Sequence, residues 1–117
     1  MLRSQTMADT ARTASFQSCY DEARRLILED KDVDGAICCL CAAPRPQSQP
    51  DCWRWTDLLA AALFAQGQYW HCLGVLCSYD RRYPEDRHAR FAIRIVTMEL
   101  LSALRDGEEA RGSRRTP

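Results

Sequence analysis

The sequence predicts an all-α fold with about five helices in a single domain. Apolar residues recur at the three- and four-residue spacing of a helix in five stretches, and no stretch shows the alternation of a half-buried strand. The chain has 117 residues, the length of one ordinary domain. Glycine and proline contribute five residues each, which disfavours a loop-rich or all-β chain. We therefore expect one helical domain over residues 15–105, preceded by a flexible N-terminus over residues 1–14.

The first two predicted helices follow each other closely. The apolar stripe of the first consists of Phe16, Cys19, Tyr20, Ala23, Leu26 and Ile27. Thr13 or Ser15 can cap this helix, because a hydroxyl oxygen can accept from the free amides of the first turn. The stripe of the second consists of Val33, Ala36, Ile37 and Leu40. Asp32 is its expected cap, and Pro44 ends it because proline has no amide hydrogen to donate.

The middle of the chain holds a connector and two more helices. Residues 44–50, PRPQSQP, are polar with three prolines and predict an extended connector. Asp51 is the expected cap of a third helix, whose apolar positions are Trp55, Leu58, Leu59, Ala62 and Leu63. Gly67 suits the left-handed position after its end. The apolar positions of the fourth helix are Tyr69, Cys72, Leu73 and Leu76.

The fifth predicted helix opens at Pro84 and runs to about Arg105. Proline is favoured in a first turn, and the carboxylates of Glu85 and Asp86 interact favourably with the helix dipole there. Residues 106–117 are polar and contain glycine, so we expect a disordered tail.

This fifth helix carries two apolar sides where a small bundle needs only one. One side consists of Ile93, Val96, Leu100 and Leu104, and we expect it to face the core of the chain itself. The nearly opposite side consists of Phe91, Ile95, Met98 and Leu101, and we expect it to face another chain. Arg94, Ser102 and Arg105 give this second side a polar rim. The alternative is a central helix that is buried all round.

Two tryptophans add candidate anchors for a partner. Trp53 and Trp70 lie off the apolar stripes of their helices, whereas Trp55 fits its stripe. The predicted partner-binding residues are therefore Phe91, Ile95, Met98, Leu101, Arg94, Trp53 and Trp70.

Catalytic and metal-binding patterns are weak. Cys38 and Cys41 form a CxxC within a helix rather than after a strand, and no second ligand pair of regular spacing accompanies it. His71 and Cys72 are neighbours on a helix and point about 100° apart, so they cannot act as a nucleophile and its base. We expect no enzyme, no catalytic residue, no cofactor and no metal site.

Charge and hydropathy argue against a nucleic-acid-binding, membrane-spanning or exported protein. Lys and Arg number 16 and so do Asp and Glu, so the net charge is zero, which argues against direct nucleic-acid binding. No apolar run approaches the ~18 residues of a membrane span. Residues 1–15 lack the apolar stretch of an export signal, so we expect a cytoplasmic protein. The cysteines number seven, and in a reducing compartment we expect no structural disulfide.

The helices also show a repeat with an offset of 36 residues. Ala36 aligns with Cys72, and Leu40 with Leu76. The second copy resembles the tetratricopeptide repeat, a pair of antiparallel helices, at Leu59, Ala60, Leu63, Gly67, Tyr69, Cys72, Leu76 and Pro84. The first copy departs from that pattern at Arg24 and Lys31. The fold class is therefore two tetratricopeptide-like hairpins plus a long C-terminal helix, which must cover the open end or present it to a partner.

The chain as a whole resembles the QslA-type quorum-sensing anti-activators of pseudomonads in length, helical layout and stretches such as residues 17–29 and 53–76. That resemblance implies a helical homodimer that binds the ligand-binding domain of a LuxR-type transcription activator and blocks its dimerisation and DNA binding. No motif transfers binding residues from that family. Two alternatives stay open. A tetratricopeptide-like type III secretion chaperone would seat a helix in a groove between the first and third helices, and a thiol or metal sensor would use Cys38 and Cys41.

Overall fold

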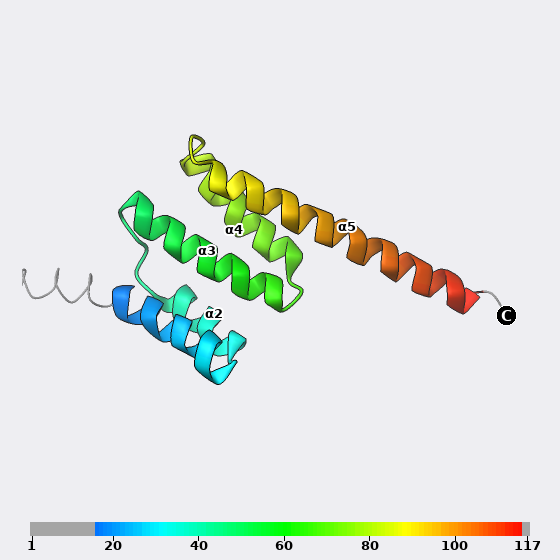
Figure 1. Cartoon of the computed structure of the whole chain (residues 1–117), viewed down its shortest axis with the longest axis horizontal. Helices are drawn as coiled ribbons and strands as arrows, with labels where there is room; N and C mark the ends of the chain where they lie inside the picture. Colours follow the sequence, from blue (N-terminus) through cyan, green and yellow to red (C-terminus); the bar gives the residue numbers. More distant parts are fainter. Residues whose placement is uncertain (1–15, 116–117) are drawn as a thin grey trace, which may run out of the picture.

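The predicted all-α class is confirmed. The computed structural model describes residues 16–115, with side chains described through residue 108, and this part of the chain contains helices and no strand (Figure 1). Residues 16–25 form an α-helix that continues as a π-helical turn. The turn and the later helices are η1 (Leu26–Asp30), α2 (Val33–Ala42), α3 (Gln49–Ala65), α4 (Tyr69–Arg82) and α5 (Arg87–Arg115). Thr13, Ser15 and the expected flexible N-terminus lie outside the described residues.

The first hairpin turns within two residues. Lys31 has a left-handed backbone with φ of 56°, and the amide of Asp32 donates to the carbonyl of Leu26 over 2.9 Å. The carboxylate of Asp32 then accepts from the amide of Gly35 over 2.9 Å, so Asp32 caps α2 as expected. The helix ends at Ala42, two residues before Pro44.

The start of α3 corrects the expected cap. The hydroxyl of Ser48 accepts from the amide of Asp51 over 3.3 Å, so Ser48 caps the helix and Asp51 lies in its first turn. The extended connector is shorter than predicted because Pro50 needs no hydrogen-bond partner in a first turn. At the other end Gly67 has φ of 74°, which confirms its predicted left-handed position.

The bounds of α5 differ from the prediction at both ends. Residues 83–86 form a turn, and the carboxylate of Asp86 accepts from the amide of His88 over 3.0 Å, so α5 begins at Arg87 and not at Pro84. The helix continues to Arg115, so residues 106–115 are helical and not a disordered tail. Adding residues to an existing helix costs little, and Glu, Ala and Arg are strong helix formers. Residues 116–117 lie outside the described residues.

The helices lie side by side in chain order (Figure 1). The third helix α3 packs against α2 and α4, and α4 packs against α3 and α5. Small residues let the backbones approach, and the shared core consists of Ala23, Ala36, Leu40, Leu59, Ala60, Leu63, Cys72, Leu76 and Val96. The aligned pairs of the repeat, Ala36 with Cys72 and Leu40 with Leu76, are all buried. This packing is that of a bundle built from helical hairpins, and it leaves α5 as the last helix with one uncovered side.

Candidate functional site

The outward side of α5 is an uncovered apolar surface. Between 45% and 70% of the surface of four large side chains is exposed, and we call these residues the α5 stripe: Phe91, Ile95, Met98 and Leu101. On the inward side Val96 and Leu100 are only 4% and 8% exposed, and Ile93 is half-buried. The two predicted sides of the helix are therefore present, and the helix is not buried all round.

Leu104 is the exception on the inward side. It is 49% exposed, although we expected it in the core with Leu100. The helix has passed the end of the bundle at this point, and its remaining turns extend beyond the other helices (Figure 1). No described helix is left there to cover the side chain, so Leu104 adds to the exposed apolar surface.

Trp53 lies beside the α5 stripe. A hollow of about 360 Å³ separates α3 from α5, with Trp53 and Asp57 on one wall and Phe91 and Ile95 on the other. The Trp53 ring also lies 5.0 Å from the Tyr79 ring, so it is held before any partner arrives. The structure thus brings together two of the predicted elements of the site.

Trp70 lies elsewhere. It is 69% exposed on α4 and lines a second cavity with Trp55 and His71, to which α5 contributes no residue. Because Trp70 faces this separate cavity, the structure does not bring it to the α5 stripe.

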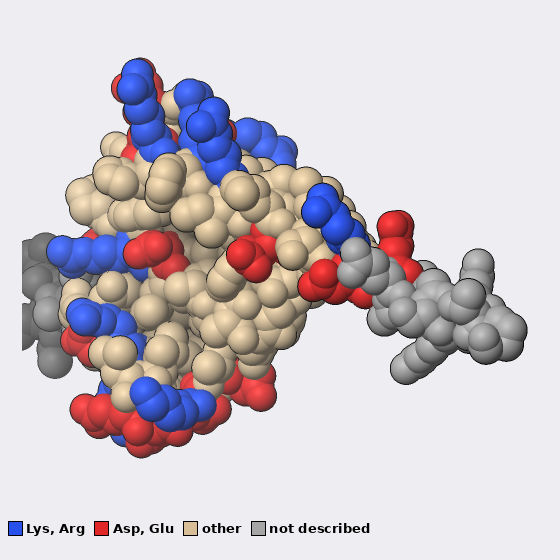
Figure 2. All heavy atoms as spheres, turned by 45° about the vertical axis from the view of Figure 1, so that its right-hand side comes forward, with Lys and Arg blue, Asp and Glu red and all other residues tan. Residues whose placement is uncertain are grey.

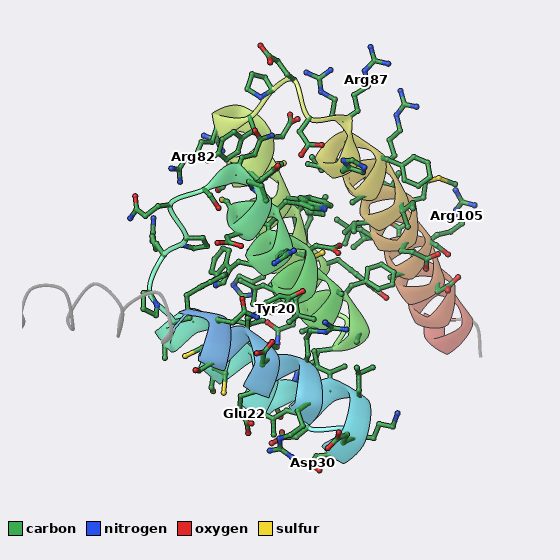
Figure 3. The ribbon with its side chains drawn as sticks, turned by 60° about the vertical axis from the view of Figure 1, so that its left-hand side comes forward. Tyr20, Glu22, Asp30, Arg82, Arg87 and Arg105 are labelled. Atoms are coloured by element: carbon green, nitrogen blue, oxygen red, sulfur yellow. The ribbon has the colours of Figure 1, made fainter. Side chains whose placement is uncertain are left out.

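Arginines border the beginning of the α5 stripe. Basic side chains gather at the upper edge of the molecule, where α4 leads into α5, and the face below them is mostly uncharged with a few acidic side chains (Figure 2). Arg90 is engaged there, since it donates to Asp80 over 3.3 Å and to the carbonyl of Pro84 over 2.9 Å. Arg87 lies one helical turn before Phe91 and Arg94 one turn after it, and both are exposed. Figure 3 shows Arg87 and Arg105 projecting outward from α5. Arg94 and Arg105, two of the three residues of the predicted polar rim, are thus exposed on α5.

A polar cluster of buried Tyr79, half-buried Asp86 and exposed His88 connects α4 to α5. The carboxylate of Asp86 accepts hydrogen bonds from the hydroxyl of Tyr79 and from the amide of His88, and the His88 ring nitrogen Nδ1 lies 2.7 Å from it. Donation by Tyr79 is the main reason that the pKa of Asp86 falls to about 2. Burial is the main cause that raises the pKa of Tyr79 to about 12. The cluster links the end of α4 to the start of α5, next to the first residue of the stripe.

The cysteines do not gather into one site. Cys38 and Cys41 are exposed on α2, whereas Cys72 is buried in the core and its Sγ donates to the carbonyl of Ala60 over 3.2 Å. Burial raises the pKa of the Cys72 thiol and so keeps it protonated. Among the residues that the structure describes, no group of three or more His, Cys, Asp or Glu side chains is placed to hold a metal ion.

Sequence reasoning missed the larger cavity and the Asp86 cluster. Gly74 in the middle of α4 was the available signal for the cavity, since a helix interior rarely benefits from glycine. Within the described residues no helix has the length and apolar character needed to cross a membrane. Comparison of the chain with protein-family models, with curated proteins and with solved structures finds no match.

Proposed function

We propose that this chain is a protein-binding regulator that sequesters a LuxR-type transcription activator and blocks its dimerisation and DNA binding. One observation carries the proposal. The α5 stripe is a continuous row of large apolar side chains on one side of a long helix, beside a half-buried tryptophan and exposed arginines. Apolar surface with aromatic anchors and an arginine border is typical of a protein interface.

The stripe can supply part of the free energy of specific binding. Covering a large apolar side chain completely contributes roughly 1.5–3 kcal/mol. The members of the stripe are about half to two-thirds exposed, so together they can contribute roughly 4–7 kcal/mol before the cost of association. Trp53 is already fixed and adds contact area at little cost in entropy. The stripe can therefore serve as the centre of an interface, with the arginines selecting the partner.

The choice of partner rests on the resemblance to the QslA-type anti-activators. A helix with an apolar face can compete for the surface that an activator uses for its own dimerisation. The zero net charge argues against an alternative in which the chain itself binds DNA. The proposal also places the protein in the cytoplasm, where the activator acts, and assigns it no catalytic role.

A homodimer is part of the same proposal. A two-fold axis across α5 would bring the same apolar side chains of two copies together, which is the usual geometry of a small homo-oligomer. In the absence of the activator, a second copy would then cover the stripe. Light scattering at several protein concentrations tests this point, and a monomer mass at every concentration would contradict it.

The test of the function is co-purification with the ligand-binding domain of a LuxR-type activator from the same genome. We expect the wild-type chain to retain the domain, and Met98→Asp to weaken binding by more than about 100-fold, because an unpaired carboxylate would be buried. Ile95→Asp should behave in the same way. Leu28→Asp is the matched control, since Leu28 is 62% exposed but lies at η1.

Two results would contradict the proposal in different ways. If the wild-type chain retains no such domain, the choice of partner is wrong. If Met98→Asp and Ile95→Asp bind as well as Leu28→Asp, with the helical circular dichroism signal intact in all three, the stripe is not the interface.

The hollow between α3 and α5 supports a second candidate, the tetratricopeptide-like type III secretion chaperone. Its apolar walls could seat a helix of a secreted subunit, although the hollow lies between α3 and α5 and not between the first and third helices. This function depends on Trp53 inside the hollow more than on Met98 along the helix. Trp53→Ala should then abolish capture of the subunit while Met98→Asp leaves it intact, which is the reverse of the order expected for the anti-activator.

A further inference from the structure

A second cavity lies away from the α5 stripe. It measures about 590 Å³ and is enclosed by the connector at Arg45 and Pro46, by one side of α3 and by the side of α4 that carries Trp70 and Arg82. Its volume is in the range of sites that hold small organic molecules. Neither the stripe nor the hollow beside Trp53 contributes a residue to it, so the function proposed above does not account for it.

Two tryptophans and a tyrosine contribute to the walls of the cavity. Trp55 and Trp70 line it together with Val75, while Thr56 and Tyr79 are almost fully buried beneath it. The indole nitrogen of Trp55 donates to the carbonyl of Leu40 over 2.8 Å, so this ring is fixed with its only donor satisfied. The walls therefore offer flat apolar surface, and a ligand does not need to accept a hydrogen bond from Trp55.

Gly74 keeps the cavity open. It lies in the interior of α4 and lines the cavity between the positions of Trp70 and Ser78. A Cβ atom added there would meet nothing within 4 Å, so it would project into open space. Glycine at such a position costs roughly 0.5–1 kcal/mol of helix stability relative to alanine. Gly74 therefore lowers the stability of α4 at a position where a side chain would project into the cavity.

The cavity is lined by positive side chains and by no carboxylate. Arg45 and Arg82 line it, and none of its lining residues is Asp or Glu. Neither arginine forms an ion pair among the described residues, although the guanidinium of Arg82 lies 5.3 Å from the centre of the Tyr83 ring. Figure 3 shows Arg82 at the end of α4, on the side of the connector. An apolar cavity with two cations and no anion complements a ligand that has a flat apolar body and one negative charge.

We propose that this cavity binds a small aromatic carboxylate. The ring system lies against Trp55 and Trp70 over Gly74, and the carboxylate points to Arg45 and Arg82. Site and function are independent of the α5 stripe, so binding here requires neither the activator nor a second copy of the chain.

Two probes of equal shape and different charge test the proposal. Naphthalene-2-acetate carries the carboxylate, and 2-naphthaleneethanol replaces it by a neutral hydroxymethyl group. Calorimetry should show the anion binding at least about tenfold more tightly than the alcohol, since a charge-assisted pair with arginine adds to the apolar contact. Equal affinity of the two probes, or no binding of either, would overturn the proposal.

Variants locate the probe. Gly74→Leu fills the cavity and should abolish binding of both probes, and it carries little risk to folding because leucine is the better helix former. Arg45→Gln with Arg82→Gln should remove the preference for the anion and spare the alcohol. Arg81→Gln is the matched control, since Arg81 is exposed on α4 but does not line the cavity.

Met98→Asp tests whether the probe binds the α5 stripe instead of the cavity. If that variant loses the probe while Gly74→Leu retains it, the probe binds the α5 stripe and the proposed site is wrong. If Met98→Asp retains the probe and Gly74→Leu loses it, the cavity is the site. Neither result bears on activator capture, so this proposal and the proposed function can fail separately.

Discussion

Met98 and Leu100 offer the most direct test of how α5 is oriented. They are two residues apart and of similar size, but Met98 is 70% exposed and Leu100 only 8%. Replacing a buried leucine by alanine costs roughly 2–5 kcal/mol of unfolding free energy. Leu100 is the last buried residue among the side chains of α5 described through residue 108, so we expect the lower part of that range, about 2–3 kcal/mol. Met98→Ala removes atoms that already contact water, and we expect a change below about 0.5 kcal/mol.

The assay is urea unfolding followed by circular dichroism, at a protein concentration where light scattering gives the monomer mass. The same variants should rank in the opposite order for binding. Covering the exposed 70% of the Met98 side chain contributes roughly 1–2 kcal/mol, so Met98→Ala should weaken activator binding by about 5–30-fold. Equal loss of stability in the two monomeric variants would refute the orientation, because it would place Met98 in the subunit's own core.

Three further predictions concern helix ends and the glycine inside α4. The pKa of Asp86 is lowered to about 2 from an ordinary 3.8, so its stabilisation is complete above a pH of about 4 and is lost as the pH falls towards 2. Allowing for solvent, we expect roughly 1 kcal/mol in acid unfolding curves, and Asp86→Asn should flatten that part of the curve. In thermal unfolding, Gly67→Ala should lower the free energy of unfolding by more than about 1 kcal/mol because φ is 74°, whereas Gly74→Ala should raise it by about 0.4–1 kcal/mol. Ser48→Ala should cost about 1 kcal/mol in urea unfolding and Asp51→Ala only a few tenths, and the reverse order would restore Asp51 as the cap.

Helices and their buried sides were predictable because periodicity reports burial directly. Val96 and Leu100 on one side of α5, and Phe91 and Met98 on the other, follow from residue spacing alone. Spacing does not report where a neighbouring helix ends, however. Leu104 has the spacing of a core residue but lies beyond the bundle, so its exposure depends on the length of α4 and not on α5.

Helix boundaries were less predictable because several residues could serve the same role. Ser48 and Asp51 are both good caps, and the choice depended on whether Pro50 begins the helix or precedes it. Pro84 was suited to a first turn, but Asp86 makes the stronger cap because Tyr79 also donates to it. That contact crosses from α4 to α5 and leaves no trace in local sequence.

The sequence could not predict which residues line the same cavity, because this depends on the three-dimensional packing of the helices. Trp53 and Trp70 both looked like anchors, and only the packing of α3 against α4 shows that they serve different cavities. Nothing in the sequence distance between Arg45 and Arg82 indicates that both line the same cavity. Such contacts depend on how hairpins rotate against each other, which the residue pattern of a single helix does not determine.

Stacking in chain order has a kinetic consequence. Because each helix packs chiefly on those next to it in the chain, few distant segments must find each other, and such topologies fold fast. The last helix has a packing neighbour on one side only, so it should detach and re-form while the others remain assembled. Amide exchange would then be slowest in α3 and fastest towards Arg115.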